Sequence, residues 1–301
     1  MDRWREGYVA GGDTRFFVRA LGHGPDLAVL LHGWPETGRA WHRVAPLLVD
    51  AGYRVACPDL KGFGRSDAPR RGYDSRTLAD EVSRLIRALH VRKAILVGHD
   101  WGGAIALATA FRHPGRVRAL VIADSPYRHV DLRHAWHIPM LNLPVLPELA
   151  FRLQADRLVP LVLRYASRTQ EAFPDEVVDE YVEAVEAAPG GWLAYYRTLP
   201  RRAVADAVTT RMRRRVPGMT APTGPHHLRV PAAVVWGEDD PVLPVGLGRR
   251  AADQLGADLV VVPGVGHFPH EEHPRAFARA VLDLTGPAPS RDAPSEVAVV
   301  G

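Results

Sequence analysis

The stretch KAILVGHDWGG, residues 93–103, decides the fold of this chain. Its first five residues form an apolar run that predicts a buried strand, and the alanine-rich segment after residue 103 predicts a helix. Between them lies the turn Gly98, His99, Asp100, Trp101, Gly102 and Gly103. A Gly-x-Asp-x-Gly turn at such a junction holds its central side chain clear of the backbone, near the first N–H groups of the helix. The pattern predicts that Asp100 is presented for chemistry.

The carboxylate of Asp100 needs no activation before it attacks. A serine in this position must first lose its proton to a histidine, whereas an aspartate with an ordinary pKa of about 3.9 is ionised at neutral pH. Asp100 can therefore attack an alkyl carbon directly. The alternative interpretation is that Asp100 is the N-cap of an ordinary helix, a position that favours aspartate.

Length and composition indicate a single catalytic unit. The 301 residues, of which 47% are hydrophobic, can bury one substantial core plus an insertion. The only cysteine, Cys57, excludes an intramolecular disulfide. It lies in an apolar stretch, so a buried strand thiol is predicted rather than a reactive one.

The sequence predicts a cytoplasmic enzyme without a membrane span. The first twenty residues carry several charges and no apolar core of a signal peptide, and no apolar run approaches the roughly 20 residues that cross a bilayer. Arginine is abundant and lysine occurs only at Lys61 and Lys93, which is typical of a GC-rich bacterial genome.

The charge of the chain does not indicate a nucleic-acid partner. The formal net charge is +4, and the clearest basic cluster is Arg211, Arg213, Arg214 and Arg215. Prolines lie beside this cluster, no aromatic residues are interleaved with it and no nucleic-acid motif is present, so a solvated surface is predicted. The expected partner is a small apolar molecule, and a homodimer is compatible with the sequence.

Apolar runs of strand length alternate with helix-like segments, which is typical of a mostly parallel central sheet flanked by helices. The predicted strands are Leu27–Leu31, Arg54–Cys57, Ala94–Val97, Ala119–Ile122, Ala232–Trp236 and Leu259–Val262. Residues 7–10 and 14–21 predict an antiparallel hairpin at the edge of this sheet, and residues 274–284 predict a final helix.

The alternation of strand-like and helix-like segments stops between about residues 125 and 229. This region contains helix-length amphipathic stretches and many prolines instead. We therefore predict an α/β core, residues 1–125 and 230–285, with an inserted helical cap, residues 126–229. Residues 286–301 are predicted to be a flexible tail. The chain has no dinucleotide fingerprint and no phosphate loop, so no cofactor is expected.

Four further motifs follow predicted strands. HGWPE, residues 32–36, can supply the backbone N–H of Trp34, which would form an oxyanion hole with that of Trp101. GFGRSD, residues 62–67, is interpreted as a tight architectural turn. WGEDDPVLP, residues 236–244, offers carboxylates, and GHF, residues 266–268, offers the imidazole of His267. Nucleophile, acid and histidine thus occur in an order known for strand–turn–helix nucleophiles.

The motifs HGWPE, GFGRSD, GHDWGG, WGEDDPVLP and GHF, in this order, resemble those of the α/β-hydrolase superfamily, and most closely its epoxide hydrolase and haloalkane dehalogenase branch. The resemblance covers nearly the whole chain and implies the α/β-hydrolase fold. It also implies Asp100 as the nucleophile, Asp240 as the acid and His267 as the base. Asp239 competes with Asp240, which is preferred because it directly precedes the proline of the motif, and Asp124 is a third candidate.

The same resemblance implies hydrolysis of an apolar epoxide to a vicinal diol. Asp100 would form an alkyl ester with the substrate, and water deprotonated by His267 would hydrolyse this ester. Epoxide hydrolases of the family protonate the ring oxygen with two cap tyrosines. Tyr196 matches the second, and a tyrosine with a pKa near 10 can donate a proton at neutral pH. His137 stands in the place of the first, which is a departure from the family.

Haloalkane dehalogenation is the main alternative, because Trp101, Trp136 and Trp192 can supply indole N–H groups to a halide. Many haloalkane dehalogenases, however, have asparagine where this chain has Trp34, and fluoroacetate dehalogenases have arginines after the nucleophile that this chain lacks. Two further functions are compatible with the same residues, namely a biosynthetic enzyme that uses them for ring closure and a non-catalytic ligand receptor.

A metal site is a weaker interpretation of the run from His267 to His273. Its histidines recur every three residues, with Glu271 and Glu272 between them. The pattern His-Glu-x-x-His is absent, however, and prolines interrupt the run, so no metal is expected.

Overall fold

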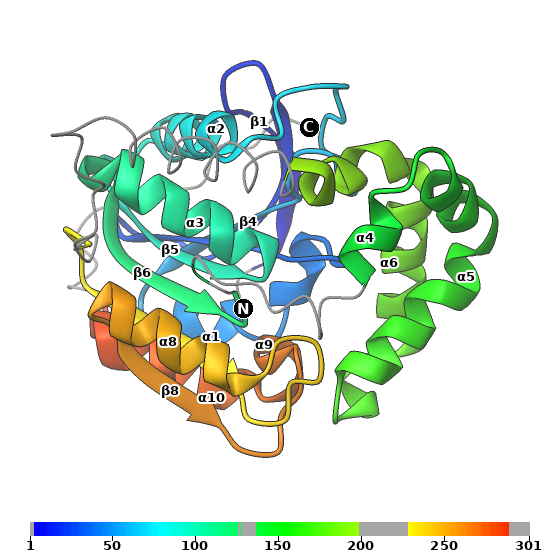
Figure 1. Ribbon diagram of the computed structural model, residues 1–301. Coiled ribbons are helices and arrows are strands. Elements are labelled where there is room, and N and C mark those ends of the chain that lie inside the picture. The colour runs from blue at the N-terminus through cyan, green and yellow to red at the C-terminus, as the bar shows by residue number, and fades with distance from the viewer. Residues whose placement is uncertain (1–2, 126, 128–136, 199–227, 289–301) are drawn as a thin grey trace, which may run out of the picture.

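An eight-stranded sheet forms the centre of the computed structural model, which describes residues 3–125, 127, 137–198 and 228–288 (Figure 1). The strand order is β1-β2-β4-β3-β5-β6-β7-β8. Only the pairs that include β2 are antiparallel, so six neighbouring strands run in one direction. The strands are β1 (Arg5–Ala10), β2 (Arg15–Leu21), β3 (Leu27–Leu31), β4 (Arg54–Pro58), β5 (Ala94–His99), β6 (Val117–Ala123), β7 (Ala232–Gly237) and β8 (Asp258–Val262). The predicted fold class is confirmed.

The central strands are apolar on both faces because helices cover both faces. Every residue of β3, β4 and β5 is buried. Helices α2 (Ser75–Ala88) and α3 (Trp101–Arg112) pack together on one face, and α1 (Ala45–Asp50) and α10 (Pro274–Thr285) pack together on the other (Figure 1). Helix α8 (Val245–Leu255) packs on β7 and β8. Cys57 is buried in β4, and burial raises the pKa of its thiol, so the predicted inert strand thiol is confirmed.

The helices α4 (His137–Leu141), α5 (Leu146–Ala166) and α6 (Asp175–Ala187), together with the helical residues 189–198, lie between β6 and β7 in the chain. We call them the cap. Helices α5 and α6 pack against each other, and Figure 1 shows the cap at one side of the sheet. Residues 126, 128–136 and 199–227 are outside the described part of the chain, so the predicted limits of the cap at residues 126 and 229 stay a prediction.

Short helices connect the larger elements. They are the 3₁₀ turns η1 (Gly38–Trp41), η2 (Pro114–Arg116) and η3 (Gln170–Ala172), and the four-residue helix α9 (Pro269–Glu272). The final helix begins and ends within one residue of its predicted limits. The first residues of the predicted tail are attached to the core, because the Tyr53 hydroxyl donates to the Gly286 carbonyl oxygen at 2.8 Å and the Ala288 N–H donates to that of Ala51 at 3.0 Å.

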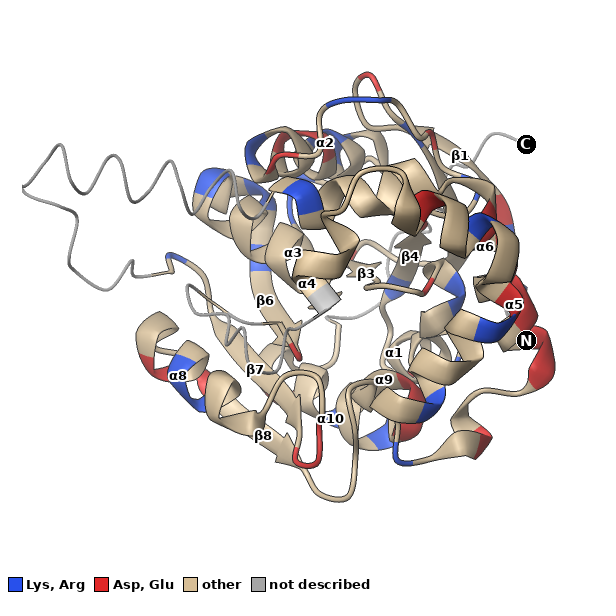
Figure 2. Ribbon diagram, turned by 45° about the vertical axis from the view of Figure 1, so that its right-hand side comes forward, with Lys and Arg blue, Asp and Glu red and all other residues tan. Residues whose placement is uncertain are grey.

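Charged residues are mostly in the helices and loops around the sheet, whereas the strands contain few of them (Figure 2). No helix in the described ranges is both long enough and apolar enough to cross a membrane. The predicted basic cluster at residues 211–215 lies outside the described residues.

Parallel strands bring their carboxyl ends to one edge of the sheet, where a ligand site is expected. Immediately after β3, β5, β6, β7 and β8 come the segments that hold Trp34, Asp100, Asp124, Asp240 and His267. The topology therefore assembles residues that are up to 233 positions apart in the sequence, from Trp34 to His267.

Candidate active site

Asp100 occupies a strained turn between β5 and α3. Its backbone angles are φ 46° and ψ −116°, a conformation that non-glycine residues rarely adopt. The close packing explains the neighbouring glycines, because a Cβ added to Gly102 would lie 2.1 Å from the Leu31 carbonyl oxygen. The Asp100 N–H donates to the Ala123 carbonyl oxygen at 3.0 Å, and the Ser125 hydroxyl donates to the Asp100 carbonyl oxygen at 2.8 Å. These contacts hold Asp100 between β5 and β6.

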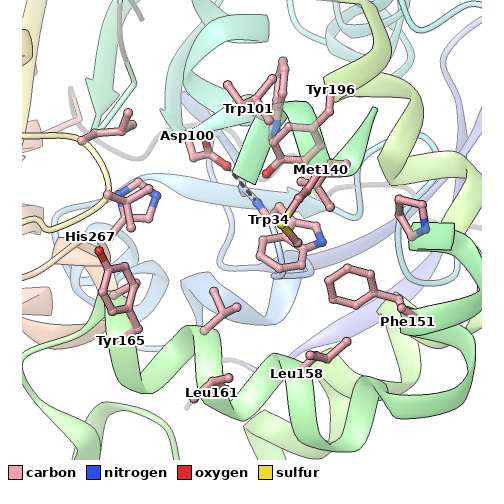
Figure 3. Close-up of a pocket in the computed structure, with 18 of the residues that line it drawn as sticks. Trp34, Asp100, Trp101, Met140, Phe151, Leu158, Leu161, Tyr165, Tyr196 and His267 are labelled. Atoms are coloured by element: carbon pink, nitrogen blue, oxygen red, sulfur yellow. Dashed lines mark hydrogen bonds between the residues drawn. The ribbon is translucent and has the colours of Figure 1, made fainter. Parts of the chain in front are cut away.

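Asp100 stands at the N-cap position of helix α3, but its side chain makes no capping hydrogen bond. Its Oδ2 instead accepts a hydrogen bond of 3.1 Å from the Trp34 N–H (Figure 3). Burial raises the pKa of Asp100 above its ordinary value, against the opposing effects of His267, His99 and the N–H groups of Trp34 and Trp101. The two predicted oxyanion donors thus both act on this carboxylate.

The loop that carries Trp34 approaches Asp100 closely. A Cβ added to Gly33 would lie 2.6 Å from the Asp100 Cβ, which explains the glycine. The Gly33 N–H donates to Glu36 Oε2 at 2.9 Å, so Glu36 fixes the same loop from behind.

His267 is oriented by Asp240. Its Nδ1 lies 2.7 Å from Asp240 Oδ2, while Asp240 Oδ1 accepts hydrogen bonds from the N–H groups of Val242 at 2.7 Å and Leu243 at 2.9 Å. Burial raises the pKa of Asp240, but His267 and the two N–H groups outweigh burial, and the net shift is downward. Asp239 is exposed, so of the two adjacent acids the fold brings Asp240 to the histidine.

The pKa of His267 is raised to about 9. Burial lowers it, but the charge and hydrogen bond of Asp240 and the charge of Asp100 have the larger combined effect. While both carboxylates are ionised, His267 is therefore mostly protonated at neutral pH. Loss of the Asp100 charge removes one of the causes and lowers this pKa.

Asp124, the third candidate acid, lies behind this pair. Its Oδ1 accepts a hydrogen bond of 3.1 Å from the Gly237 N–H, and the residue is fully buried. Burial and the nearby Asp240 charge raise the pKa of Asp124 well above its ordinary value. No hydrogen bond joins Asp124 to His267 Nδ1 in the described structure, where the partner of that nitrogen is Asp240.

Three buried residues beside the site, Glu36, His99 and His270, received no catalytic role in the sequence analysis. Glu36 Oε2 lies 2.8 Å from His99 Nδ1, and Glu36 Oε1 lies 2.7 Å from His270 Nε2. The other ring nitrogen of His99 lies 2.8 Å from the carbonyl oxygen of His267. Burial raises the pKa of Glu36, but the two histidines outweigh it and keep the carboxylate ionised. The signals in the sequence that could have pointed to Glu36 and His99 were the glutamate of HGWPE and the histidine of GHDWGG.

The suspected metal run does not converge on one point. His267 pairs with Asp240, His270 pairs with Glu36, and His273 is exposed. Burial lowers the pKa of His270 to about 4, so it acts here as a neutral hydrogen-bonding group.

A cavity of about 710 Å³ lies between the cap and the sheet edge and contains Asp100 and His267 (Figure 3). Among its described lining residues these two are the only ones with ionisable acid or imidazole groups, and no arginine or lysine is present. The apolar wall comes largely from α4, α5 and the turn between them, and includes Ile138, Met140, Leu143, Leu146, Phe151, Leu158, Leu161 and Val162. The chemistry of this wall fits an uncharged apolar ligand.

Tyr196 reaches the cavity from the helical residues 189–198. Its ring packs edge-on against Trp101, with 5.0 Å between ring centroids, and Figure 3 shows its hydroxyl directed toward Asp100 and Trp34. Burial, followed by the charge of Asp100, raises the pKa of Tyr196 well above its ordinary value. Its hydroxyl therefore stays protonated across the neutral range. The side chain of His137, the other predicted donor, lies outside the described residues.

The tryptophan side chains near the site differ in whether the indole N–H has a hydrogen-bond partner. The Trp192 N–H donates to the Val185 carbonyl oxygen at 3.2 Å, so the expectation that it is available to a halide is wrong. Trp136 lies outside the described residues. The buried Nε1 atoms of Trp34 and of the predicted halide donor Trp101 have no hydrogen-bond partner among the described residues, and both residues line the cavity.

Residues 28–274 match the family described as the alpha/beta hydrolase fold, which is most of the chain. The chain belongs to this family. This α/β hydrolase is 30% identical over 302 residues to the AB hydrolase superfamily protein YfhM of Bacillus subtilis, covering 94% of this chain and 98% of that protein. It is 27% identical over 291 residues to Epoxide hydrolase 3 of Xenopus tropicalis, and the match covers 92% of this chain and 73% of that protein.

Solved structures show the same fold. The α/β hydrolase superposes on Cfl2 of Burkholderia cenocepacia with a TM-score of 0.77, 26% identity and coverage of 93% of this chain and 95% of that one. The resemblance predicted from the motifs, to the epoxide hydrolase-like branch of the superfamily, is confirmed by relatives that carry that name.

Proposed function

We propose that this α/β hydrolase opens an apolar epoxide to a vicinal diol through an ester on Asp100. The observation that carries the proposal is the position of the Asp100 carboxylate. One of its oxygens accepts the Trp34 N–H, the Tyr196 hydroxyl faces it across the cavity, and His267 lies beside it (Figure 3). The relatives named epoxide hydrolases support the same reaction.

In the first step, a carboxylate oxygen of Asp100 attacks one ring carbon and the bond between that carbon and the ring oxygen breaks. The Tyr196 hydroxyl gives its proton to the released oxygen, and the resulting tyrosinate regains a proton from water. The product is an alkyl ester in which Asp100 has lost its charge. The pKa of His267 then falls, because the Asp100 charge is one of the causes that raise it, and the imidazolium releases its proton to water.

In the second step, His267 takes a proton from water, and the hydroxide formed attacks Cγ of Asp100. The negative charge that develops on the former carboxylate oxygen is stabilised by the N–H groups of Trp34 and Trp101, and one such donor is worth about 3 kcal/mol in comparable sites. Asp240 stabilises the protonated His267. Collapse of the intermediate breaks the ester, and the diol oxygen takes the proton from His267. The Asp100 carboxyl group formed then gives its proton to His267, which restores the carboxylate and the protonated imidazole.

The substrate is proposed to be uncharged and largely apolar. The described wall has no arginine or lysine to pair with a carboxylate, and burying an unpaired charge there is costly. A volume of about 710 Å³ accommodates a molecule of drug-like size.

Haloalkane dehalogenation is the second candidate. The indole N–H groups of Trp34 and Trp101, which have no hydrogen-bond partner among the described residues, favour it. The nucleophile and the ester would be the same, with halide as the leaving group. The engaged N–H of Trp192 argues against it, because one expected halide donor is absent.

The test is to incubate the enzyme with matched panels of epoxides and haloalkanes and to follow diol and halide release in parallel, with Asp100→Asn as the control. Diol release that the substitution abolishes supports the proposal, and halide release alone supports the second candidate. In a single turnover in heavy-oxygen water, the label should enter Asp100 and be absent from the first diol. Label in the first diol would exclude the ester.

A further inference from the structure

Glu272, at the end of α9, joins the histidine loop to the cap. Its carboxylate accepts hydrogen bonds from the N–H groups of Gly266 at 3.1 Å and Phe268 at 3.2 Å, the two neighbours of His267. The same carboxylate accepts hydrogen bonds from the N–H groups of Arg168 at 2.6 Å and Thr169 at 3.0 Å, just after α5 ends. One side chain thus holds two segments that are about 100 residues apart in the sequence.

The backbone of His267 continues this junction. Its N–H donates to the carbonyl oxygen of Ala166, the last residue of α5, at 2.8 Å, and its carbonyl oxygen lies 2.8 Å from His99 Nε2. The contact is close, because a Cβ added to Gly266 would lie 2.3 Å from the Ala166 carbonyl oxygen. His267 is therefore held between the end of the cap helix and the strand that precedes Asp100.

We propose that Glu272 is a positioning residue that sets the place of His267 by fixing its loop to the end of α5. The inference rests on the proposed function, in which His267 acts on the ester and Asp100 acts on the substrate. Asp100 is held by hydrogen bonds with Ala123, Ser125 and Trp34. In the described part of the chain, the hydrogen bonds of the Glu272 side chain go to other residues. Glu272 therefore governs the second step of the reaction and leaves the first step nearly unchanged.

Energetics favour a selective effect. A carboxylate that accepts four backbone N–H groups holds them with charge-assisted hydrogen bonds, which are roughly twice as strong as neutral ones. A displacement of a reacting group by about 1 Å can slow a reaction by roughly 10²-fold. Loosening the loop by a fraction of that distance is thus enough to slow attack of water on the ester.

Two substitutions and one control isolate the effect. Glu272→Gln replaces one acceptor oxygen with an NH₂ group that faces N–H donors, so one of the two segments is released. Glu272→Asp keeps both oxygens on a shorter side chain and should restore part of the function. Glu186→Gln makes the same change at an exposed position on α6, with no expected effect.

The experiment is a single-turnover reaction with enzyme in excess over an epoxide that the wild type converts, quenched at intervals and analysed by mass spectrometry for the Asp100 ester. For Glu272→Gln we expect ester hydrolysis to slow by about 10-fold to 100-fold, ester formation to stay within about threefold, and the ester to accumulate. The rate of ester hydrolysis in Glu272→Asp should lie between those of the wild type and Glu272→Gln. A folded Glu272→Gln protein with unchanged hydrolysis, or with both steps slowed equally, would overturn the inference.

A second readout separates this inference from the proposed function. The NMR signals of the His267 ring report its hydrogen bond to Asp240 without any turnover. A shift of these signals in Glu272→Gln or Glu272→Asp, and none in Glu186→Gln, supports the positioning role even if the wild type forms no ester. Unchanged ring signals in both Glu272 variants exclude it, whereas absence of the ester in the wild type alone refutes only the proposed function.

Discussion

The side chains of Asp124 and Asp240 place carboxylate oxygens within 4.8 Å of each other, at the ends of the adjacent strands β6 and β7. At this separation, ionisation of one buried carboxyl group disfavours ionisation of the other. The pKa of Asp124 is raised, chiefly by burial, and that of Asp240 is lowered, because His267 and two backbone N–H groups more than offset burial. Of the two groups, Asp124 therefore holds a proton more strongly, and Asp240 ionises more readily and orients His267.

The same substitution should have different effects at Asp124 and at Asp240. Asp124→Asn keeps an oxygen that can accept the Gly237 N–H and leaves the Asp240 contact with His267 in place, so turnover should stay within about threefold of wild type. Asp240→Asn removes the charge that holds His267 and should slow turnover by about 10³-fold to 10⁴-fold. Steady-state kinetics of the two variants measure this difference. Equal losses would mean that Asp124 shares the role of partner to His267.

Tyr196→Phe removes the hydroxyl that faces Asp100 and should slow ester formation by about 10²-fold to 10⁴-fold. Hydrolysis of any ester that forms should be unaffected, because water and His267 carry that step. Rapid-quench measurement of both rate constants provides the test.

The adjacent Tyr195 supplies a matched control for this prediction. Its hydroxyl donates to the Lys61 carbonyl oxygen at 2.8 Å, away from the cavity. Tyr195→Phe should lower the free energy of unfolding by about 1–3 kcal/mol and leave both rate constants within about threefold. A Tyr196→Phe variant that forms the ester as fast as Tyr195→Phe would show that the hydroxyl donates no proton.

The stability of the protein should depend on pH through His267. Its folded pKa of about 9 lies above the ordinary value of 6.5, so protonated His267 stabilises the fold. This contribution, on the order of 3 kcal/mol, is fully present below about pH 6.5 and is lost as pH rises through about 9. Denaturant unfolding of wild type and His267→Gln from pH 6 to 10 should show a difference that shrinks with pH. A constant difference would contradict the raised pKa.

Gly33→Ala should damage the site directly. The added Cβ would lie 2.6 Å from the Asp100 Cβ and 2.9 Å from Asp100 Oδ2. Both loops must move apart, which should cost about 1–3 kcal/mol of stability and slow turnover at least about 10-fold. Gly115→Ala is the control, since no atom lies within 4 Å of its added Cβ. Thermal melting and turnover of the two variants decide the point, and equal behaviour would be inconsistent with this packing.

Local sequence patterns were sufficient for the sheet and for the turn at Asp100. The predicted strands and hairpin are present with ends shifted by at most two residues, because an apolar run of strand length that is covered on both faces has few other ways to be buried. The turn was predictable because Gly98, Asp100 and Gly102 are close in sequence and their backbone geometry is set by local sterics.

The sequence alone determined which segments reach the site, because parallel strands place their carboxyl ends at one edge and the motifs follow those ends. Only the tertiary structure decided which side chains meet there. Asp239 and Asp240 are adjacent in sequence, yet one is exposed and the other is fixed by the N–H groups of its own turn. The contact of Glu36 with His270 spans 234 residues, and that of Glu272 with Arg168 spans 104. Contacts of this kind depend on how the cap and the loops pack, and no local pattern encodes that packing.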